Sequence, residues 1–407
     1  RDADGCARFA QGASPGLVGT GVAGRRRSRP VGVGVAVGDN DVMARSSMAA
    51  WGITPRLITM TVSAVATFAL LLVMMLVPVP FGLQAPGPTV DTLGESGDVP
   101  LIEVEGDTPT YPTSGELLLT TVTTAGGPGY PLDSGSVVRG WLSPTMRVAP
   151  IETFFDPSQT QEELDAASSQ QMISSQENAT VAALTELGYD VPAVLTIVGA
   201  QEGTGADGVT AEGDVIAAID DGGGPVEVET FDDLASVLEA TAPGSTVTLV
   251  VERDGEETEL PIVTGDDGRG GSVLGVFLAG EFDYPVEVRI QLENIGGPSA
   301  GTMFALGIID RLTPGEITGG QVIAGTGTVS LGGLVGPIGG IQQKMAGARQ
   351  DGAEYFLAPS ANCDEVVGHI PDGLTVISTS TLEESVDALE VIADGGDVSA
   401  LPACTLS

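Results

Sequence analysis

The sequence predicts an α+β protein that has a single transmembrane helix near its amino end and further folded domains after it. Leu57–Val77 contains no charged residue, and its 21 residues are long enough, at about 1.5 Å each, to span a bilayer core. After it, strand-like runs of alternating polarity and longer runs of helical period follow one another between turn signals. The full length of 407 residues suffices for two or three domains.

Charge divides the chain at the apolar run. Residues 1–56 carry eight of the 16 basic residues and four of the 55 acidic ones, and residues 78–407 carry the other eight and 51. Because the positive flank of a span faces the cytoplasm, the sequence predicts a single-pass cell-membrane protein with an extracytoplasmic acidic part. The alternative is a cleaved signal peptide, which normally has a shorter apolar region of about 7–15 residues. The net charge of −39 argues against nucleic acid as a partner.

The predicted parts follow one another in chain order. Residues 1–56 form an Arg-rich cytoplasmic leader, part of which is untranslated if Met43 or Met48 is the start. The other parts are the span (57–77), a region of strands and a long helix (89–190), a first domain (191–265), a second domain (272–395) and a tail (396–407).

Two residue types exclude whole classes of function. Lys344 is the only lysine and Met345 follows it, so the Gly-Lys-Ser/Thr of a phosphate-binding P-loop is missing and ATP is not expected to bind. His369 is the only histidine, which excludes zinc motifs that need two. No metal and no cofactor are therefore expected.

Residues 191–265 show an ordered series of strand, helix and turn signals. Thr230 and Asp233 predict a capped helix start, and Asp254-Gly255 predicts a hairpin turn. The segment resembles PDZ domains of bacterial proteases in four patterns that follow in order: Glu212-Gly213-Asp214-Val215-Ile216, Asp232-Asp233-Leu234, Pro243-Gly244-Ser245-Thr246-Val247 and Arg253-Asp254-Gly255. The resemblance implies a groove that binds the carboxyl end of a peptide as an added strand; the alternative is a spacer whose groove is unused.

Ser299 stands in a glycine-rich turn before a run that is apolar on nearly all sides, as in a buried helix. Small neighbours would let a peptide approach, and free N–H groups at a helix start can stabilise an oxyanion. These features suit a nucleophile. The alternative is a serine that merely caps the helix.

Lys344 lies in the first turns of another predicted helix, again after a glycine turn and beside apolar Ile341 and Met345. Burial and the positive end of the helix dipole would both lower its pKa. A neutral lysine can act as a general base. The alternative is an ordinary surface lysine.

Three motifs in this order resemble the proteolytic domain of Lon-type proteases: Gly297-Pro298-Ser299-Ala300-Gly301, Thr326-Gly327 and Pro337-Ile338-Gly339-Gly340-Ile341-Gln342-Gln343-Lys344. The resemblance implies that Ser299 is the nucleophile and Lys344 the general base. It implies that Thr326 orients the lysine and that Gly297, Pro298 and Ala300 support the oxyanion site. Two departures are the missing ATPase module and Gly296, which stands where Lon proteases often have an acidic residue.

Together, the span and the two domains resemble a family of membrane-anchored, PDZ-containing Lon-like proteases. This implies an ATP-independent serine endopeptidase that cleaves exposed or unfolded segments of envelope and secreted proteins, with the PDZ domain recruiting their tails. One alternative is a non-catalytic adaptor, and another is a Ser-His-Asp triad that uses His369. The sequence leaves homo-oligomer formation open.

Cys363 and Cys404 are the two cysteines outside the leader, where Cys6 lies. In an oxidising compartment such cysteines tend to pair. We predict a disulfide that ties the tail to the second domain; two free thiols are the alternative.

Overall fold

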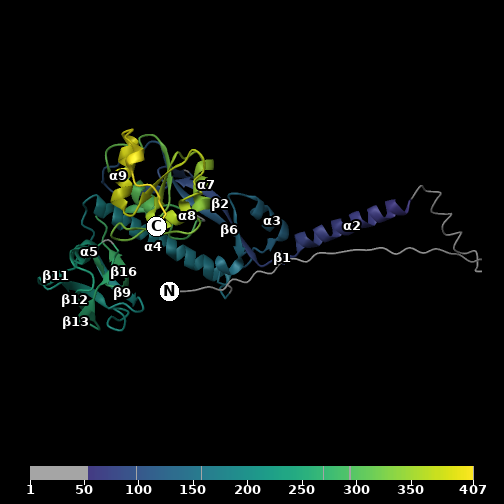
Figure 1. Cartoon of the computed structure of the whole chain (residues 1–407). Coiled ribbons are helices and arrows are strands. Elements are labelled where there is room, and N and C mark those ends of the chain that lie inside the picture. The colour runs from purple at the N-terminus through teal and green to yellow at the C-terminus, as the bar shows by residue number, and fades with distance from the viewer. Residues whose placement is uncertain (1–53, 98, 157, 269, 293–294, 407) are drawn as a thin grey trace, which may run out of the picture. The chain divides into compact units, whose positions relative to one another are not determined.

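The computed structural model describes residues 54–97, 99–156, 158–268, 270–292 and 295–406 (Figure 1). Residues 1–53 of the leader, with Cys6 and the two alternative starts, lie outside the described residues. The first helix among the described residues is α2 (Pro55–Leu76), and none of its side chains is buried. Its length and composition are sufficient to cross a membrane. It lies within two residues of the predicted span at either end.

The site described below is built on a six-stranded mixed sheet. In spatial order the strands are β22 (Thr375–Thr379), β21 (Tyr355–Pro359), β18 (Val322–Gly325), β6 (Glu116–Ala125), β2 (Phe81–Asp91) and β8 (Arg147–Pro150). The first four are parallel, and β2 and β8 are each antiparallel to the strand before them. Half of the strands come from residues 81–150, so the sheet extends well beyond the segment 272–395 expected from the sequence.

Helices cover both faces of this sheet. On one face, α4 (Gln161–Glu186), α6 (Gly301–Leu312) and α9 (Leu382–Ala393) share a core with Ile323 and Leu357. On the other face, α7 (Ile341–Gln350) and α8 (Cys363–Val366) share a core with Ala324 and Phe356. Successive side chains of a strand point to opposite faces. The inner strands β18 (VIAG) and β21 (YFLAP) therefore carry almost only apolar residues, as strands buried on both sides must.

Residues 191–282 form a separate sheet with its own core, which we call the middle domain. Its strands in spatial order are β13 (Glu256–Val263), β12 (Thr246–Arg253), β10 (Val215–Asp220), β9 (Ala193–Ala200) and β16 (Val276–Phe282), with β11 (Val226–Glu227) beside β10 and the helix α5 (Phe231–Ala240). Thr230 and Asp233 form the predicted capping box. Positive φ angles at Asp254 and Gly255, 55° and 82°, make the predicted turn. Because β16 pairs with β9 from Ala193 to Ala200, this sheet continues past residue 265.

The remaining elements are short. They are β1 (Pro78–Val79), β3 (Glu95–Ser96), β4 (Val99–Pro100), β5 (Ile102–Val104), β7 (Leu132–Asp133), α3 (Ser134–Leu142), η1 (Ile151–Thr153), β14 (Gly265–Asp266), β15 (Ser272–Val273), β17 (Val288–Ile290), β19 (Thr328–Val329), β20 (Val335–Gly336), η2 (Ser360–Asn362) and η3 (Val398–Ala400).

Strand β2 is the main element that the sequence did not predict, because its prolines suggest an extended exit from the membrane. Proline lacks the N–H that a central strand needs for its ladder. The structure accommodates Pro86 and Pro88 at an irregularity, since the β2–β6 register shifts between Pro86 and Thr89. Strand β8 pairs only with Phe81–Gln84. The prolines thus lie beyond the part of β2 that is paired on both sides.

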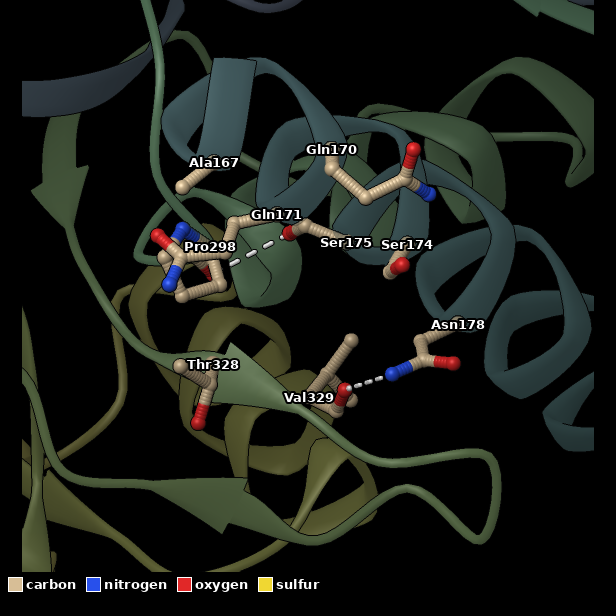
Figure 2. A pocket seen from close by; sticks show the side chains of 9 residues that line it. All are labelled: Ala167, Gln170, Gln171, Ser174, Ser175, Asn178, Pro298, Thr328 and Val329. Carbon is tan, nitrogen blue, oxygen red and sulfur yellow. Dashed lines mark hydrogen bonds between the residues drawn. The ribbon is translucent and has the colours of Figure 1, made fainter. Parts of the chain in front are cut away.

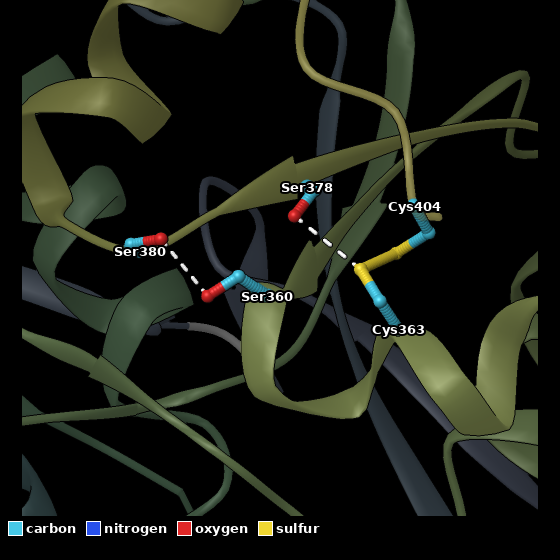
Figure 3. Close-up of a disulfide and its surroundings, with 5 residues drawn as sticks. All are labelled: Ser360, Cys363, Ser378, Ser380 and Cys404. Atoms are coloured by element: carbon cyan, nitrogen blue, oxygen red, sulfur yellow. Dashed lines mark hydrogen bonds between the residues drawn. A yellow bond between two sulfur atoms is a disulfide. The ribbon is translucent and has the colours of Figure 1, made fainter. Parts of the chain in front are cut away.

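A disulfide joins Cys363 at the start of α8 to Cys404 in the tail (Figure 3). The Ser378 hydroxyl lies 3.4 Å from the Cys363 sulfur. A backbone hydrogen bond also ties the tail to β22, because the Ser378 N–H donates to the Pro402 carbonyl at 2.8 Å. The carboxyl end is thus fastened to the outer strand of the mixed sheet.

We expect Cys404→Ser to lower the free energy of unfolding. The chain-entropy model gives at most about 4 kcal/mol for a loop of this length. The separation of the two cysteines is 41 residues. Denaturant titration of the oxidised wild type and the variant measures the difference. Reduced wild type should match the variant. Maleimide labelling of both cysteines in unreduced, denatured protein would contradict the pairing.

Candidate active site

Ser299 lies in the turn that leads into α6. Gly297 has a φ of +86°, a conformation that favours glycine. Ala300 is the N-cap residue and no side chain caps this end, so the interpretation of Ser299 as a capping serine is wrong. Its side chain is partly buried and bonds to another residue instead.

Lys344 is the fourth residue of α7, and its side chain turns into the protein, where 2% of the residue is exposed. Its Nζ atom lies 2.8 Å from Ser299 Oγ, 2.8 Å from Thr326 Oγ1 and 2.9 Å from the Thr120 carbonyl oxygen. The interpretation of Lys344 as a surface lysine is therefore wrong. The structure brings Ser299, Thr326 and Lys344 together as the motifs predicted.

The hydrogen bonds around Nζ determine where a neutral lysine would keep its lone pair. The Thr326 hydroxyl donates to the Ser299 carbonyl oxygen at 2.9 Å, so Thr326 Oγ1 can only accept from Nζ. The Thr120 carbonyl has no proton and also accepts. A neutral amine has two N–H bonds, and these two acceptors use both of them. The lone pair then points at the Ser299 hydroxyl, as removal of its proton requires.

Burial also sets the protonation state of Lys344. Taking an ammonium group out of water disfavours its charge, and this lowers the pKa of Lys344 from 10.5 to about 7. Ile341 and Met345 on the same helix contribute to the apolar core beside it. Near neutral pH a large fraction of the amine is therefore unprotonated, as a general base must be.

Carbonyl contacts fix the turn around Ser299. The Ser175 hydroxyl on α4 donates to the Pro298 carbonyl at 3.0 Å, and the Gly327 N–H donates to the Ser299 carbonyl at 2.9 Å. In a trans peptide the C=O and the next N–H point in opposite directions. The N–H groups of Ser299 and Ala300 thus point away from these anchors. Within the described part of the chain, neither donates to another backbone group.

A cleft of about 370 Å³ lies beside this turn, between α4 and β19 (Figure 2). Pro298 lines it, together with Gln171, Ser174 and Thr328, and none of its lining residues is charged. Figure 2 shows two of the polar groups already hydrogen-bonded, Ser175 to Pro298 and Asn178 to the Val329 carbonyl. Although Gln170, Gln171, Ser174 and Thr328 also line the cleft, the surface that it offers to a ligand is mainly apolar.

Sequence reasoning missed Thr120 and Ser175. Thr120 contributes its backbone carbonyl, which every residue type has, so no motif marks it. Ser175 is one of several serines on a polar helix, and its contact with residue 298 spans 123 positions. His369 is exposed in the loop after α8, and Ser299 is paired with Lys344 instead, so the triad alternative has no support.

Residues 294–391 match the family model of the Lon protease (S16) C-terminal proteolytic domain. This part of the chain is a Lon-type proteolytic domain. Relatives include Lon protease 2 of Bacillus subtilis, 38% identical over 110 residues, which are 27% of this chain and 19% of that protein. Lon protease 1 of the same bacterium is 33% identical over 110 residues, 26% of this chain and 14% of that protein. The chain thus spans less than a fifth of the length of either relative.

Solved PDZ domains are similar to about a fifth of the chain. One is the PDZ domain of an SdrC-like protein from Listeria monocytogenes, with 20% identity, a TM-score of 0.19, and coverage of 22% of this chain and 90% of that one. The corresponding domain from Listeria innocua gives 20% identity and a TM-score of 0.18, over 21% of this chain and 92% of that one.

We expect the free energy of unfolding of the wild type to rise relative to that of Lys344→Met as the pH increases above 7. An unfolded lysine keeps its proton up to about pH 10.5, whereas the folded one loses it near 7. Between these values the unfolded state binds more protons, so raising the pH favours the folded state by up to about 1.4 kcal/mol per pH unit. Denaturant titrations at pH 7, 8 and 9 measure the slope.

The matched control is Arg349→Met on the same helix, because an arginine stays protonated throughout this range. Its difference from wild type should not change between pH 7 and 9. An equally flat difference for Lys344→Met would mean that Nζ stays charged in the folded protein.

Proposed function

We propose that the protein is a membrane-anchored, ATP-independent serine endopeptidase in which Ser299 is the nucleophile and Lys344 the general base. The observation that carries the proposal is the 2.8 Å contact between a buried Nζ and a serine Oγ. Its proposed substrates are exposed or unfolded segments of envelope and secreted proteins. The Lon-type proteolytic domain of residues 294–391 supports peptide hydrolysis as the reaction.

The geometry supports the following reaction. Neutral Lys344 takes the Ser299 proton while Oγ attacks the peptide carbonyl carbon. The N–H groups of Ser299 and Ala300 stabilise the oxyanion that forms. The lysine, now an ammonium, donates to the Thr120 carbonyl and Thr326 Oγ1 until it passes its proton to the leaving amine. A water molecule, deprotonated in turn by Lys344, then attacks the ester carbon of the acyl-enzyme, and the C–Oγ bond breaks as Lys344 returns the proton to Ser299 Oγ.

Substrate recognition is proposed at two places. The uncharged cleft beside Pro298 suits an uncharged side chain near the scissile bond. The middle domain, through its resemblance to PDZ domains, would recruit protein tails by strand addition. The rival function is a non-catalytic adaptor that binds proteins through the middle domain alone. A fluorophosphonate probe separates the two, because it labels an activated serine.

Single substitutions of the dyad should abolish activity. Arginine does not give up its proton near neutral pH, so Lys344→Arg should lose nearly all casein cleavage, as should Ser299→Ala. The double variant should be little worse than either, because the two residues act as one unit. Wild-type activity should rise with pH through about 7, as Lys344 loses its proton.

The measurement is cleavage of labelled casein by the full chain in detergent, together with fluorophosphonate labelling. Arg349→Lys is the control, since it exchanges the two cations elsewhere on α7 and should retain activity. Circular dichroism confirms that each variant is folded. A folded Lys344→Arg variant that cleaves at the wild-type rate would overturn the dyad mechanism and favour the adaptor.

The proposed topology places everything after Pro80 outside the cytoplasm, because the basic flank of the apolar run precedes it. Added protease should therefore digest these residues in spheroplasts without lysis. A cytoplasmic marker protein, intact in the same sample, is the control. Full protection of the 80–407 region would mean the opposite orientation.

A further inference from the structure

Helix α3 (Ser134–Leu142) exposes an apolar side to solvent. Its inner side is buried through Val137 and Gly140, and a Cβ atom at Gly140 would collide with Leu83 and Val148. Its outer side carries three large apolar residues: Val138, Trp141 and Leu142, with exposed fractions of 44%, 61% and 81%. Exposed apolar residues gathered on one side of a helix mark a surface for contact with a partner or an apolar medium.

The chain ties the start of this helix to the end of α2. Helix α2 ends at Leu76, and strand β1 follows at Pro78–Val79. Strand β1 pairs antiparallel with β7, with Pro78 opposite Asp133. Asp133 then caps α3, because its carboxylate accepts from the Ser136 N–H at 2.9 Å. If α2 crosses the membrane, these contacts hold the first turn of α3 close to the point where the chain leaves the bilayer.

Charge is distributed unusually in the same region. The chain from 54 to 90 contains no acidic residue, and the chain from 117 to 151 contains one, Asp133. This stands against 51 acidic residues in 78–407 as a whole. Two of the eight basic residues of that part lie here, Arg139 and Arg147, and both are exposed. Among the described residues neither forms a salt bridge.

We propose that α3 docks on the anionic surface of the bilayer that α2 crosses. Trp141 and Leu142 would enter the layer between headgroups and acyl chains, where tryptophan is enriched and amphipathic helices lie. Arg139 and Arg147 would lie at the level of the lipid phosphates. Phe81 packs edge-on against Trp141, with ring centroids 5.9 Å apart, and keeps the indole in position.

A lipid surface fits these observations better than a protein partner does. An anionic surface repels acidic side chains and attracts basic ones, which explains both the near absence of acids and the two exposed arginines, although the Arg147 guanidinium also lies 5.7 Å from the centroid of the Phe154 ring. Tethering by α2 keeps the local lipid concentration high, so a small contact suffices. The inference rests on the membrane anchoring proposed above, and the experiment therefore tests the two separately.

The experiment uses the full chain in anionic liposomes with Trp51→Phe, which leaves Trp141 as the only tryptophan. We expect lipids brominated on their acyl chains to lower Trp141 emission about twofold or more, and iodide in solution to have little effect, because the ring would lie in the interfacial layer. Arg139→Gln with Arg147→Gln should reduce the bromolipid quenching. The same pair of changes should have a smaller effect in zwitterionic liposomes.

Alkaline washing of the liposomes reports on the anchor by itself. A chain that stays in the washed membrane and shows bromolipid quenching supports the inference. A retained chain whose Trp141 is quenched by iodide alone overturns the docking and leaves the anchor in place. Retention with protection from both quenchers overturns it in favour of a protein contact on this face. A chain that washes off overturns both the anchor and the docking, while casein cleavage still tests the peptidase independently.

Discussion

The hydrogen bond between Lys344 Nζ and Ser299 Oγ is the interaction on which the arrangement of the mixed sheet and its helices around the candidate site depends. A lysine side chain with 2% of its surface exposed is costly to bury, so its surroundings must satisfy it. Helix α7 brings it in through a glycine turn in which Gly340 has a φ of +74°. A Cβ atom there would lie within about 3 Å of Gln84 and Val122, on strands β2 and β6. The helix is thus set directly on the sheet.

Three segments far apart in the chain surround that amine, and the parallel pairing of β6 and β18 brings two of them together. Leu119 of β6 lies opposite Gly325 of β18, so Thr120 and Thr326 follow at the same level. The Thr120 hydroxyl donates to the Gly325 carbonyl at 3.0 Å and holds β6 and β18 together where their backbone pairing ends. The acceptors for Nζ therefore lie on β6 and directly after β18, whereas Ser299, the proposed nucleophile, is held by loops and helix α4.

Side chains with specific chemistry were predictable from the sequence, whereas backbone partners were not. Ser299, Lys344 and Thr326 stand in motifs, because their reactivity depends on residue type. Thr230 could be recognised because a cap requires particular side chains. Thr120 acts through a carbonyl that any residue would supply. Strand β2 was obscured by prolines whose missing N–H groups matter only where a partner strand lies.

The pairing of β9 with β16 sets Ala193 opposite Phe282, so the middle domain leaves and rejoins the rest of the chain at neighbouring points. It is inserted between α4, whose Ser175 holds the Pro298 carbonyl, and the turn that carries Ser299. The paired strands β9 and β16 form a two-stranded stem. In the chain, β9 follows α4, and β16 precedes the turn that carries Ser299. Such an insertion can be exchanged for another module, or shortened to a hairpin, without cutting any strand of the mixed sheet. In evolutionary terms, the middle domain and the part that carries Ser299 and Lys344 can change separately, because among the described residues the stem is the only covalent junction between them.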